Sequence, residues 1–212
     1  MIDHRARQRF GRWAATVLLC TTSSAFAAGT GEPRVGHLAF DPHHTVVAFH
    51  LAGNLHDVYG TFALENGALA VDPESGVATG TIVVSATSGE SGNTSRDARM
   101  TSSVLDADHF PDVRFRAERV EGHPDADGAF RATLYGVLTL RGDEHDVAIT
   151  AAGILAGDVL RAHARFALPY VAWGLPDPSI LILTVAKTVD LDVTTEGHVT
   201  WSHEPTRTTG DQ

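Results

Sequence analysis

Histidine, whose imidazole can bind metal ions or transfer protons, is abundant in this sequence, with 12 copies among 212 residues. His43, His44, His50 and His56 are close in sequence, and three or four such ligands are what a zinc ion requires. Neighbouring residues of a strand point to opposite faces, and His44 and His50 would lie about 20 Å apart along an extended strand. We therefore expect no metal site, and a histidine-based metal binder stays an alternative interpretation.

The nucleophilic, acidic and basic residues of the sequence do not form a recognisable catalytic motif. The sequence contains no G-x-S-x-G elbow, no phosphate-binding loop and no G-x-G-x-x-G fingerprint. Asp41 and His43 could form an acid–base pair, but nothing orients a nucleophile beside them. Three further carboxylates cluster around one turn, as capping or solvating residues do: Asp106, Asp108 and Asp112. We expect a protein that is not an enzyme and that has no catalytic residue and no cofactor.

A single short helix is predicted in the segment 94–115, TSRDARMTSSVLDADHFPDVRF, and a strand follows it. Thr94 is expected to cap the helix, and Asp97 is expected to return a bond to the N–H of the cap. Met100 and Val104 then share one face of the helix. One lone helix among strands narrows the architecture more than any other segment does.

The start of this helix also carries the best candidates for polar contacts with a ligand. Backbone N–H groups and the side chains of Arg96 and Asp97 could meet a phosphate or a quinone oxygen there. In the alternative interpretation, Arg96 and Asp97 hold the helix to the rest of the fold by a salt bridge and a cap. The residues alone leave both interpretations open.

The remaining sequence alternates between apolar and polar residues, which is typical of strands. Asn66-Gly67 predicts a hairpin turn. The predicted strands are 47–51, 58–64, 69–72, 79–87, 113–117, 130–141, 145–154, 159–168 and 180–195. Eight or nine strands with short turns favour an all-β antiparallel fold, and closure into a barrel removes exposed strand edges. The interior of an eight-stranded barrel is either filled by side chains or holds one slender ligand, and both fit the pattern.

Three motifs in register carry a resemblance to a known family. They are FDPHHTVVAF at 40–49, the helix segment at 94–115 and YGVLTLRG at 135–142. Together they resemble the YceI family of lipocalin-like, lipid-binding bacterial proteins, over roughly Val35 to Val199. The resemblance implies a lipocalin-like eight-stranded antiparallel β-barrel with one short helix between strands. It also implies an elongated hydrophobic tunnel for a polyisoprenoid, a quinone or another long-chain lipid.

Strand parity, or a position on the helix or a nearby loop, selects the side chains that would line such a tunnel. These candidates are Phe49, Phe62, Ile82, Val84, Met100, Phe110, Phe115, Leu138, Phe166 and Trp173. Arg96, Asp97 and His44 are the polar candidates, with His43 beside the last, and ordinary packing or turn contacts are the alternative for every one of them. The loop 169–179 is expected to be either a rim over one end of the tunnel or a rigid connection.

The first 27 residues resemble a secretory signal peptide rather than part of the fold. Four arginines precede a short apolar run, and an A-x-A cleavage pattern ends at Ala27. The run at 14–20 is far shorter than the roughly 20 residues of a spanning helix. We expect a domain at 28–212 without an integral membrane span, in the periplasm. Cys20, the one cysteine, leaves with the signal unless it serves as a lipoprotein anchor.

Removing four arginines and one aspartate with the signal lowers the formal net charge from −10 to −13. Such an acidic surface argues against binding nucleic acid, or an anionic membrane face, through bulk electrostatics. We expect an exported carrier that encloses a long-chain isoprenoid lipid, quinone or fatty lipid, and homodimerisation is compatible with the family. The main alternative is a packed barrel without a ligand, which would act as a structural or interaction module.

Overall fold

The computed structural model describes residues 34–180 and 182–203, and the signal peptide predicted at 1–27 lies outside this part of the chain. Its one α-helix, α1 (Thr94–Arg99), continues as a π-helical turn (Met100–Val104), and two short 3-10 turns span Pro42–His44 and Ala86–Ser88. The strands are β1 (Arg34–Phe40), β2 (Val46–Leu51), β3 (Val58–Phe62), β4 (Leu64–Val71), β5 (Ala78–Ser85), β6 (Asp112–Glu121), β7 (Ala129–Leu140), β8 (Asp143–Ala156), β9 (Val159–Leu168) and β10 (Val189–His203). Within the described residues, no helix has the length and hydropathy needed to cross a bilayer.

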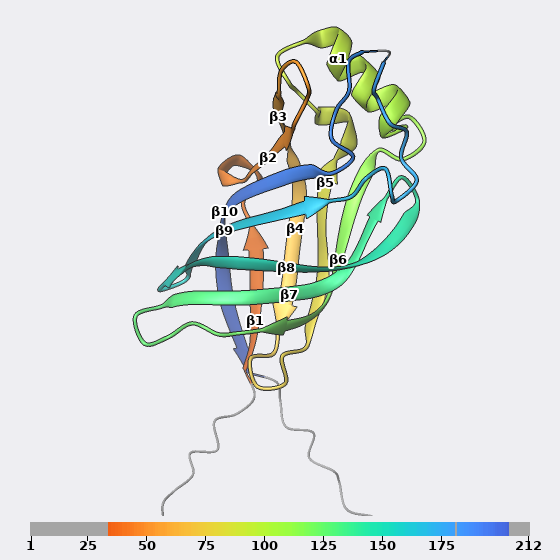
Figure 1. Ribbon diagram of the computed structural model, residues 1–212. Helices are drawn as coiled ribbons and strands as arrows, with labels where there is room; N and C mark the ends of the chain where they lie inside the picture. The colour runs from red at the N-terminus through yellow and green to blue at the C-terminus, as the bar shows by residue number, and fades with distance from the viewer. Residues whose placement is uncertain (1–33, 181, 204–212) are drawn as a thin grey trace, which may run out of the picture. The chain divides into compact units, whose positions relative to one another are not determined.

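The sheet closes on itself, because β1 pairs with β4 on one side and with β10 on the other. The closed ring runs β1-β4-β5-β6-β7-β8-β9-β10, and the pairings within it are antiparallel. The predicted eight-stranded barrel with a single short helix is therefore confirmed. Strand β2 also pairs with β10, next to the segment of β10 that pairs with β1, and β3 pairs with β2. Figure 1 shows α1 and the β2–β3 hairpin at the same end of the barrel, opposite the β4–β5 turn.

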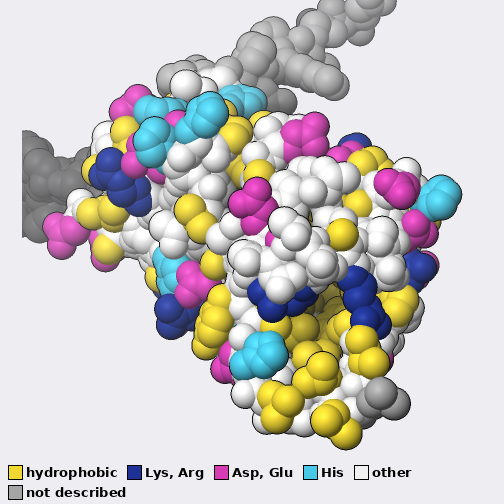
Figure 2. Space-filling view, turned by 90° about the horizontal axis from the view of Figure 1, so that it is seen from above, with side chains coloured by type: hydrophobic (Ala, Val, Ile, Leu, Met, Phe, Trp, Pro, Cys, Tyr) yellow, Lys and Arg dark blue, Asp and Glu magenta, His cyan; other side chains and the backbone are white. Residues whose placement is uncertain are grey.

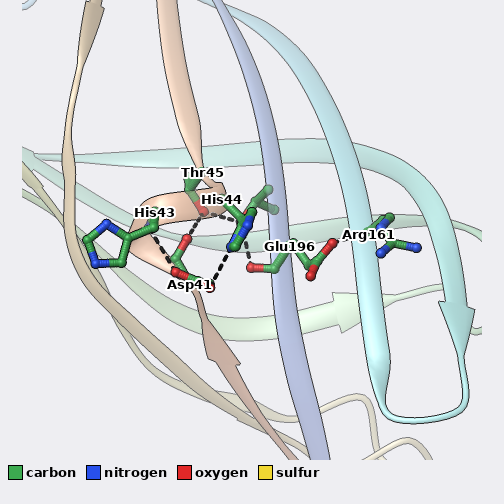
Figure 3. A network of polar contacts seen from close by, with 7 residues as sticks. Asp41, His43, His44, Thr45, Arg161 and Glu196 are labelled. Atoms are coloured by element: carbon green, nitrogen blue, oxygen red, sulfur yellow. Dashed lines mark hydrogen bonds and ion pairs between the residues drawn. The ribbon is translucent and has the colours of Figure 1, made fainter.

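The bend between β1 and β2 is fixed by polar contacts to β10, shown in Figure 3. The N–H of Asp41 donates to the carbonyl of Glu196 over 2.9 Å. The hydroxyl of Thr45 donates to the carbonyl of Asp41 over 2.8 Å, and it lies 2.6 Å from the hydroxyl of Thr195. Among the described residues, Thr45 is the one polar residue whose side chain is buried. Because of these bonds, β1 and β2 both pair with β10 although the chain bends between them.

Inward-facing apolar residues alternate with exposed ones along the strands, most regularly on β8 and β9. Two clusters are buried: Leu69, Ala78, Phe115, Ala117, Leu138 and Leu168 in the barrel wall, and Leu140, Tyr170 and Leu175 beneath the loop after β9. No large side chain among the described residues is fully buried. A solid core would bury several, so this pattern indicates a barrel with a hollow interior.

Two sequence predictions about the strands were wrong. Asn66-Gly67 makes no hairpin turn but lies inside β4, at a bulge in its pairing with β5. A Cβ on Gly67 would lie 2.9 Å from the Phe40 ring, so this glycine allows two strands to pack closely. The last strand begins at Val189 rather than at residue 180, because the preceding residues form turns and isolated bridges.

The start of the helix also differs from the prediction. Asn93, not Thr94, is the N-cap, and its side-chain oxygen accepts from the N–H of Arg96. The carboxylate of Asp97 does not accept from the N–H of the cap; it accepts from the N–H and the hydroxyl of Ser91. Asparagine and threonine are both good caps, so the one-residue shift is within the usual uncertainty of helix ends.

Candidate functional site

The barrel encloses a cavity of about 1020 Å³ that runs between its two ends. This volume is at the upper end of the roughly 300–1,000 Å³ typical of small-molecule pockets. Ser95, Arg96 and Met100 bound the cavity at the helix end, and Glu74, His123 and Trp201 bound it at the opposite end. Nearly all of the lining between them is aliphatic or aromatic. Such a space suits a long apolar molecule with few polar groups.

Most of the side chains predicted to contact a ligand, whether as tunnel lining or as polar partners, do face this cavity. They are Phe49, Phe62, Ile82, Val84, Arg96, Met100, Phe115, Leu138 and Phe166. Strand parity places all of these except Arg96 and Met100, which come from α1 and the π-helical turn. The rings of Phe49 and Phe62 lie 5.4 Å apart and are tilted by 42°. A Cβ on Gly89 would come within 2.5 Å of the Met100 methyl, so the Met100 side chain packs closely on the segment that precedes α1.

Four predicted residues do not line the cavity. Phe110 covers the turn at Gly142, where an added Cβ would lie 2.7 Å from its ring. The Trp173 ring stacks on His145 at 4.1 Å. Asp97 is bonded to Ser91, and His44 lies on the outside of the barrel next to Asp41. The two aromatic residues were placed from loop positions and His44 from a bend, where no strand parity exists to indicate direction.

Arg96 and Asp97 are joined through Ser91 rather than by a direct salt bridge. Nε of Arg96 donates to the Ser91 hydroxyl, and a second guanidinium nitrogen donates to the Ser91 carbonyl, each over 2.7 Å. The Ser91 hydroxyl in turn donates to Asp97. This arrangement holds the guanidinium of Arg96 at the cavity lining while Asp97 is turned away from it.

Arg99 is a cavity-lining residue that sequence reasoning missed. It lies one turn after Arg96 and is exposed at the same end of the cavity. The i,i+3 spacing of the two arginines was the available signal. Neither arginine makes an ion pair within the part of the chain that the structure describes. Figure 2 shows positively charged side chains beside a hollow lined with hydrophobic ones.

Other missed residues come from the loops at this end. Leu55 and His56 of the β2–β3 loop line the cavity, as do Tyr170 and Leu175 after β9. The Tyr170 hydroxyl donates to the carbonyl of Ala186, and burial raises the pKa of Tyr170 to about 12. The loop at 169–179 is therefore both a packed connection and part of the cavity wall. Only its aromatic content hinted at this role in the sequence.

His44 and Asp41 form a hydrogen-bonded pair on the outer surface (Figure 3). Nδ1 of His44 lies 2.7 Å from a carboxylate oxygen of Asp41. This bond raises the pKa of His44 above its ordinary value and lowers the pKa of Asp41. Nearby, Nε of Arg161 donates to Glu196 over 2.8 Å. The cluster stabilises the bend before β2 and does not reach the cavity.

Metal coordination finds no support in the side-chain geometry. His50 bonds to Asp57 on its own hairpin and stacks on Tyr59, whereas His44 bonds to Asp41. Among residues 34–180 and 182–203, no three His, Cys, Asp or Glu side chains are grouped as metal ligands.

Comparison with known proteins decides the family. The model of the YceI-like domain matches residues 38–197. The chain belongs to the YceI family. No curated protein matches it. Residues 38–197 include the bend at Asp41, helix α1 and all of the barrel strands except the first four residues of β1 and the last six of β10.

Solved structures of YceI-like proteins share the fold of this family member at low identity. A polyisoprenoid-binding domain from Saccharophagus degradans has a TM-score of 0.61 at 12% identity, over 77% of this chain and 98% of its own. BcnA from Burkholderia cenocepacia has a TM-score of 0.58 at 14% identity, over 74% and 98%. The YCEI protein of Campylobacter jejuni has a TM-score of 0.51 at 16% identity, over 62% and 79%. These likenesses show a common barrel.

Proposed function

We propose that this YceI-family protein is an exported carrier that encloses one long-chain isoprenoid lipid or quinone in its barrel. The observation that carries the proposal is the cavity of about 1020 Å³, which runs the length of the barrel and is lined almost entirely by apolar side chains. Moving a CH₂ group from water into such surroundings is worth about 0.8 kcal/mol, so a long chain gains affinity without many polar contacts. The polyisoprenoid binding of the Saccharophagus relative supports the same class of ligand.

Arg96 and Arg99 give the cavity two unlike ends. An apolar chain would lie among Phe49, Phe62 and Phe115, and its polar head would lie beside the arginines. The guanidinium of Arg96 is held in place by Ser91 and can donate to a phosphate or quinone oxygen. No step of this function requires a reaction, a metal ion or a cofactor other than the lipid.

Export is the second part of the proposal. The basic and apolar pattern of residues 1–27 and the A-x-A site before Ala28 support removal of a signal peptide and a periplasmic setting. The mature domain would then start at Ala28, and N-terminal sequencing of the periplasmic protein tests this boundary. A protein that keeps Cys20 would instead support a lipoprotein anchor.

The experiment for the ligand is extraction of the protein after native purification from the periplasm. Organic extraction followed by mass spectrometry should yield a stoichiometric polyisoprenoid, quinone or fatty lipid. An empty extract, repeated after incubation with a total lipid extract, would contradict the carrier function and support a ligand-free interaction module. Size-exclusion chromatography of the same sample with light scattering measures whether the carrier is a homodimer.

A further inference from the structure

Two loops at the helix end of the barrel hold aliphatic side chains out into solvent. The first is the β2–β3 loop, and the second leads from Pro178 towards β10. Ile182 is 79% exposed and Leu55 66% exposed, while Leu183 and Ile180 are 44% and 43% exposed. We call these four residues the aliphatic rim. Grouped exposed aliphatic residues of this size mark an interaction surface more often than solitary ones do.

The aliphatic rim has a defined backbone because Asn54 ties the two loops together. Its side-chain amide donates to the carbonyl of Ile182 over 2.8 Å and accepts from the N–H of Thr184 over 3.0 Å. The N–H of Asn54 also donates to the carbonyl of Thr184 over 3.0 Å. Backbone groups that are already paired lose little when water is removed from them. The rim can therefore enter an apolar phase more cheaply than an open loop could.

The rim is continuous with the mouth of the cavity. Leu55, Ile180 and Leu183 line the cavity in addition to being exposed, and Ile182 lies next to them outside it. A ligand that entered at this end would pass from whatever touches the rim directly onto the apolar lining. The surface seen in Figure 2 carries hydrophobic side chains around the hollow in the same way.

The charges at this mouth suit phosphate groups although the whole chain is acidic. Arg96 and Arg99 line the cavity here, and Glu74, the one carboxylate in the lining formed by residues 34–180 and 182–203, lies at the other end. The acidic residues nearest to the rim in sequence are hydrogen-bonded: Asp57 accepts from Gly53 and His50, and Asp177 accepts from Ser179. Arg96 and Arg99 therefore place positive charge at this mouth, although the formal net charge of the mature chain is −13.

We propose that the aliphatic rim docks the barrel, mouth first, on a phospholipid bilayer. Ile182, Leu55 and Leu183 enter the interface, and Arg96 and Arg99 meet lipid phosphates around the opening. This proposal rests on the proposed lipid-carrier function, because a carrier would dock on a bilayer in order to collect or release a water-insoluble ligand. Its structural basis is a set of exposed aliphatic side chains at the same mouth as two arginines that make no ion pair within the described residues, and this does not depend on which lipid is carried.

Vesicle sedimentation tests the docking with the mature protein. Vesicles of phosphatidylethanolamine and phosphatidylglycerol are pelleted, and the bound fraction is measured for wild type, Ile182→Ser, Ile182→Trp and Arg99→Gln. Losing one inserted aliphatic side chain should weaken partition about tenfold. Tryptophan is favoured at membrane interfaces, so Ile182→Trp should bind at least as well as wild type. Ile154→Ser is the matched control, because Ile154 is 42% exposed on β8 and does not line the cavity.

The outcomes separate this inference from the carrier function. Equal sedimentation of wild type and Ile182→Ser would overturn docking through the rim, and so would failure of the wild type to bind vesicles. In either case, lipid in the organic extract would leave the carrier function standing. Vesicle binding without any extracted lipid would support docking and contradict the carrier function. Dimerisation that Ile182→Ser abolishes, without vesicle binding, would overturn the proposal and assign the rim to a second copy of the chain.

Discussion

The ring of Phe49 lies over Gly60, its register partner on the neighbouring strand β3. A Cβ on Gly60 would come within 2.5 Å of this ring and 2.3 Å of the carbonyl of Glu90. The glycine therefore lets an aromatic ring of the cavity lining and the segment before α1 approach the same strand. The wall of the cavity and the support of the helix are coupled at this one position.

Gly60→Ala should destabilise the fold by about 2 kcal/mol, because the crowded backbone carbonyl cannot move aside as a side chain could. Urea denaturation measures the free energy of unfolding. Thr61→Ala, the exposed neighbour on the same strand, is the control and should change it by less than about 0.5 kcal/mol. Equal stability of Gly60→Ala and wild type would show that the close approach does not matter.

The hydroxyl pair of Thr45 and Thr195 should contribute to closure at the bend before β2. Thr45→Val keeps the shape but removes a donor to Asp41 and a partner of Thr195, at a cost of about 1–2 kcal/mol. In a double-mutant cycle with Thr195→Val, we expect a coupling energy of about 1 kcal/mol. Thr87→Val at the exposed Ser85–Thr87 pair is the control. Strict additivity would contradict a stabilising contact between the two hydroxyls.

The His44–Asp41 pair should make stability depend on pH in a defined direction. The pKa of His44 is raised in the folded protein, so its contribution is fully present below about pH 6.5 and is lost as the pH rises through the raised value. The pKa of Asp41 is lowered, so its contribution is present above the ordinary aspartate value and is lost as the pH falls through the lowered one.

Thermal unfolding of wild type and His44→Gln across this range measures the effect. The wild type should have the higher Tm in mildly acidic buffer, and the difference should shrink as the buffer becomes alkaline. His43→Gln is the control, because the His43 ring points away from Asp41 (Figure 3). A Tm difference that grows with pH would reverse the sign and contradict the pairing.

A substitution at His145 should raise the free energy of unfolding, whereas the substitutions described above should lower it. Its Nε2 is buried without a hydrogen-bond partner among the described residues, while its ring stacks on Trp173 with an angle of 5° between the planes. His145→Phe keeps the stacking and removes the buried polar atom, so the free energy of unfolding should rise by about 1 kcal/mol. His145→Ala loses the stacking and should be destabilising. A loss of stability in His145→Phe would show that the nitrogen is satisfied.

Strand parity explains why much of the cavity lining was predictable from the sequence. Phe115 and Leu138 pair directly in register on β6 and β7, and each follows from alternation within its own strand. The hairpin of β8 and β9 was equally predictable from local sequence, because its turn at 157–158 follows a long run of alternating apolar and polar residues. Such features depend on neighbours in sequence. Periodicity alone favoured a closed barrel, and the family motifs made the prediction of closure specific.

Long-range contacts explain the predictions that were wrong. The turn tendency of Asn66-Gly67 was overridden because β4 pairs with β1 and β5 and needs a glycine beneath Phe40. The direction of Trp173 depended on His145, which lies on another element. Nothing in the sequence indicated that Asn54 would join two loops and expose Ile182. Turn and loop side chains carry no periodicity, so their directions follow from packing alone.

The central claim is that a lipid occupies the barrel, and native mass spectrometry of intact protein from the periplasm tests it most directly. Ala164 lines the cavity on β9, and Ala167 is exposed on the same strand. Ala164→Trp should fill the tunnel and stay folded but lose the bound mass, whereas wild type and Ala167→Trp should retain one lipid per barrel. An unloaded wild type, or the same bound mass in Ala164→Trp, would contradict the claim.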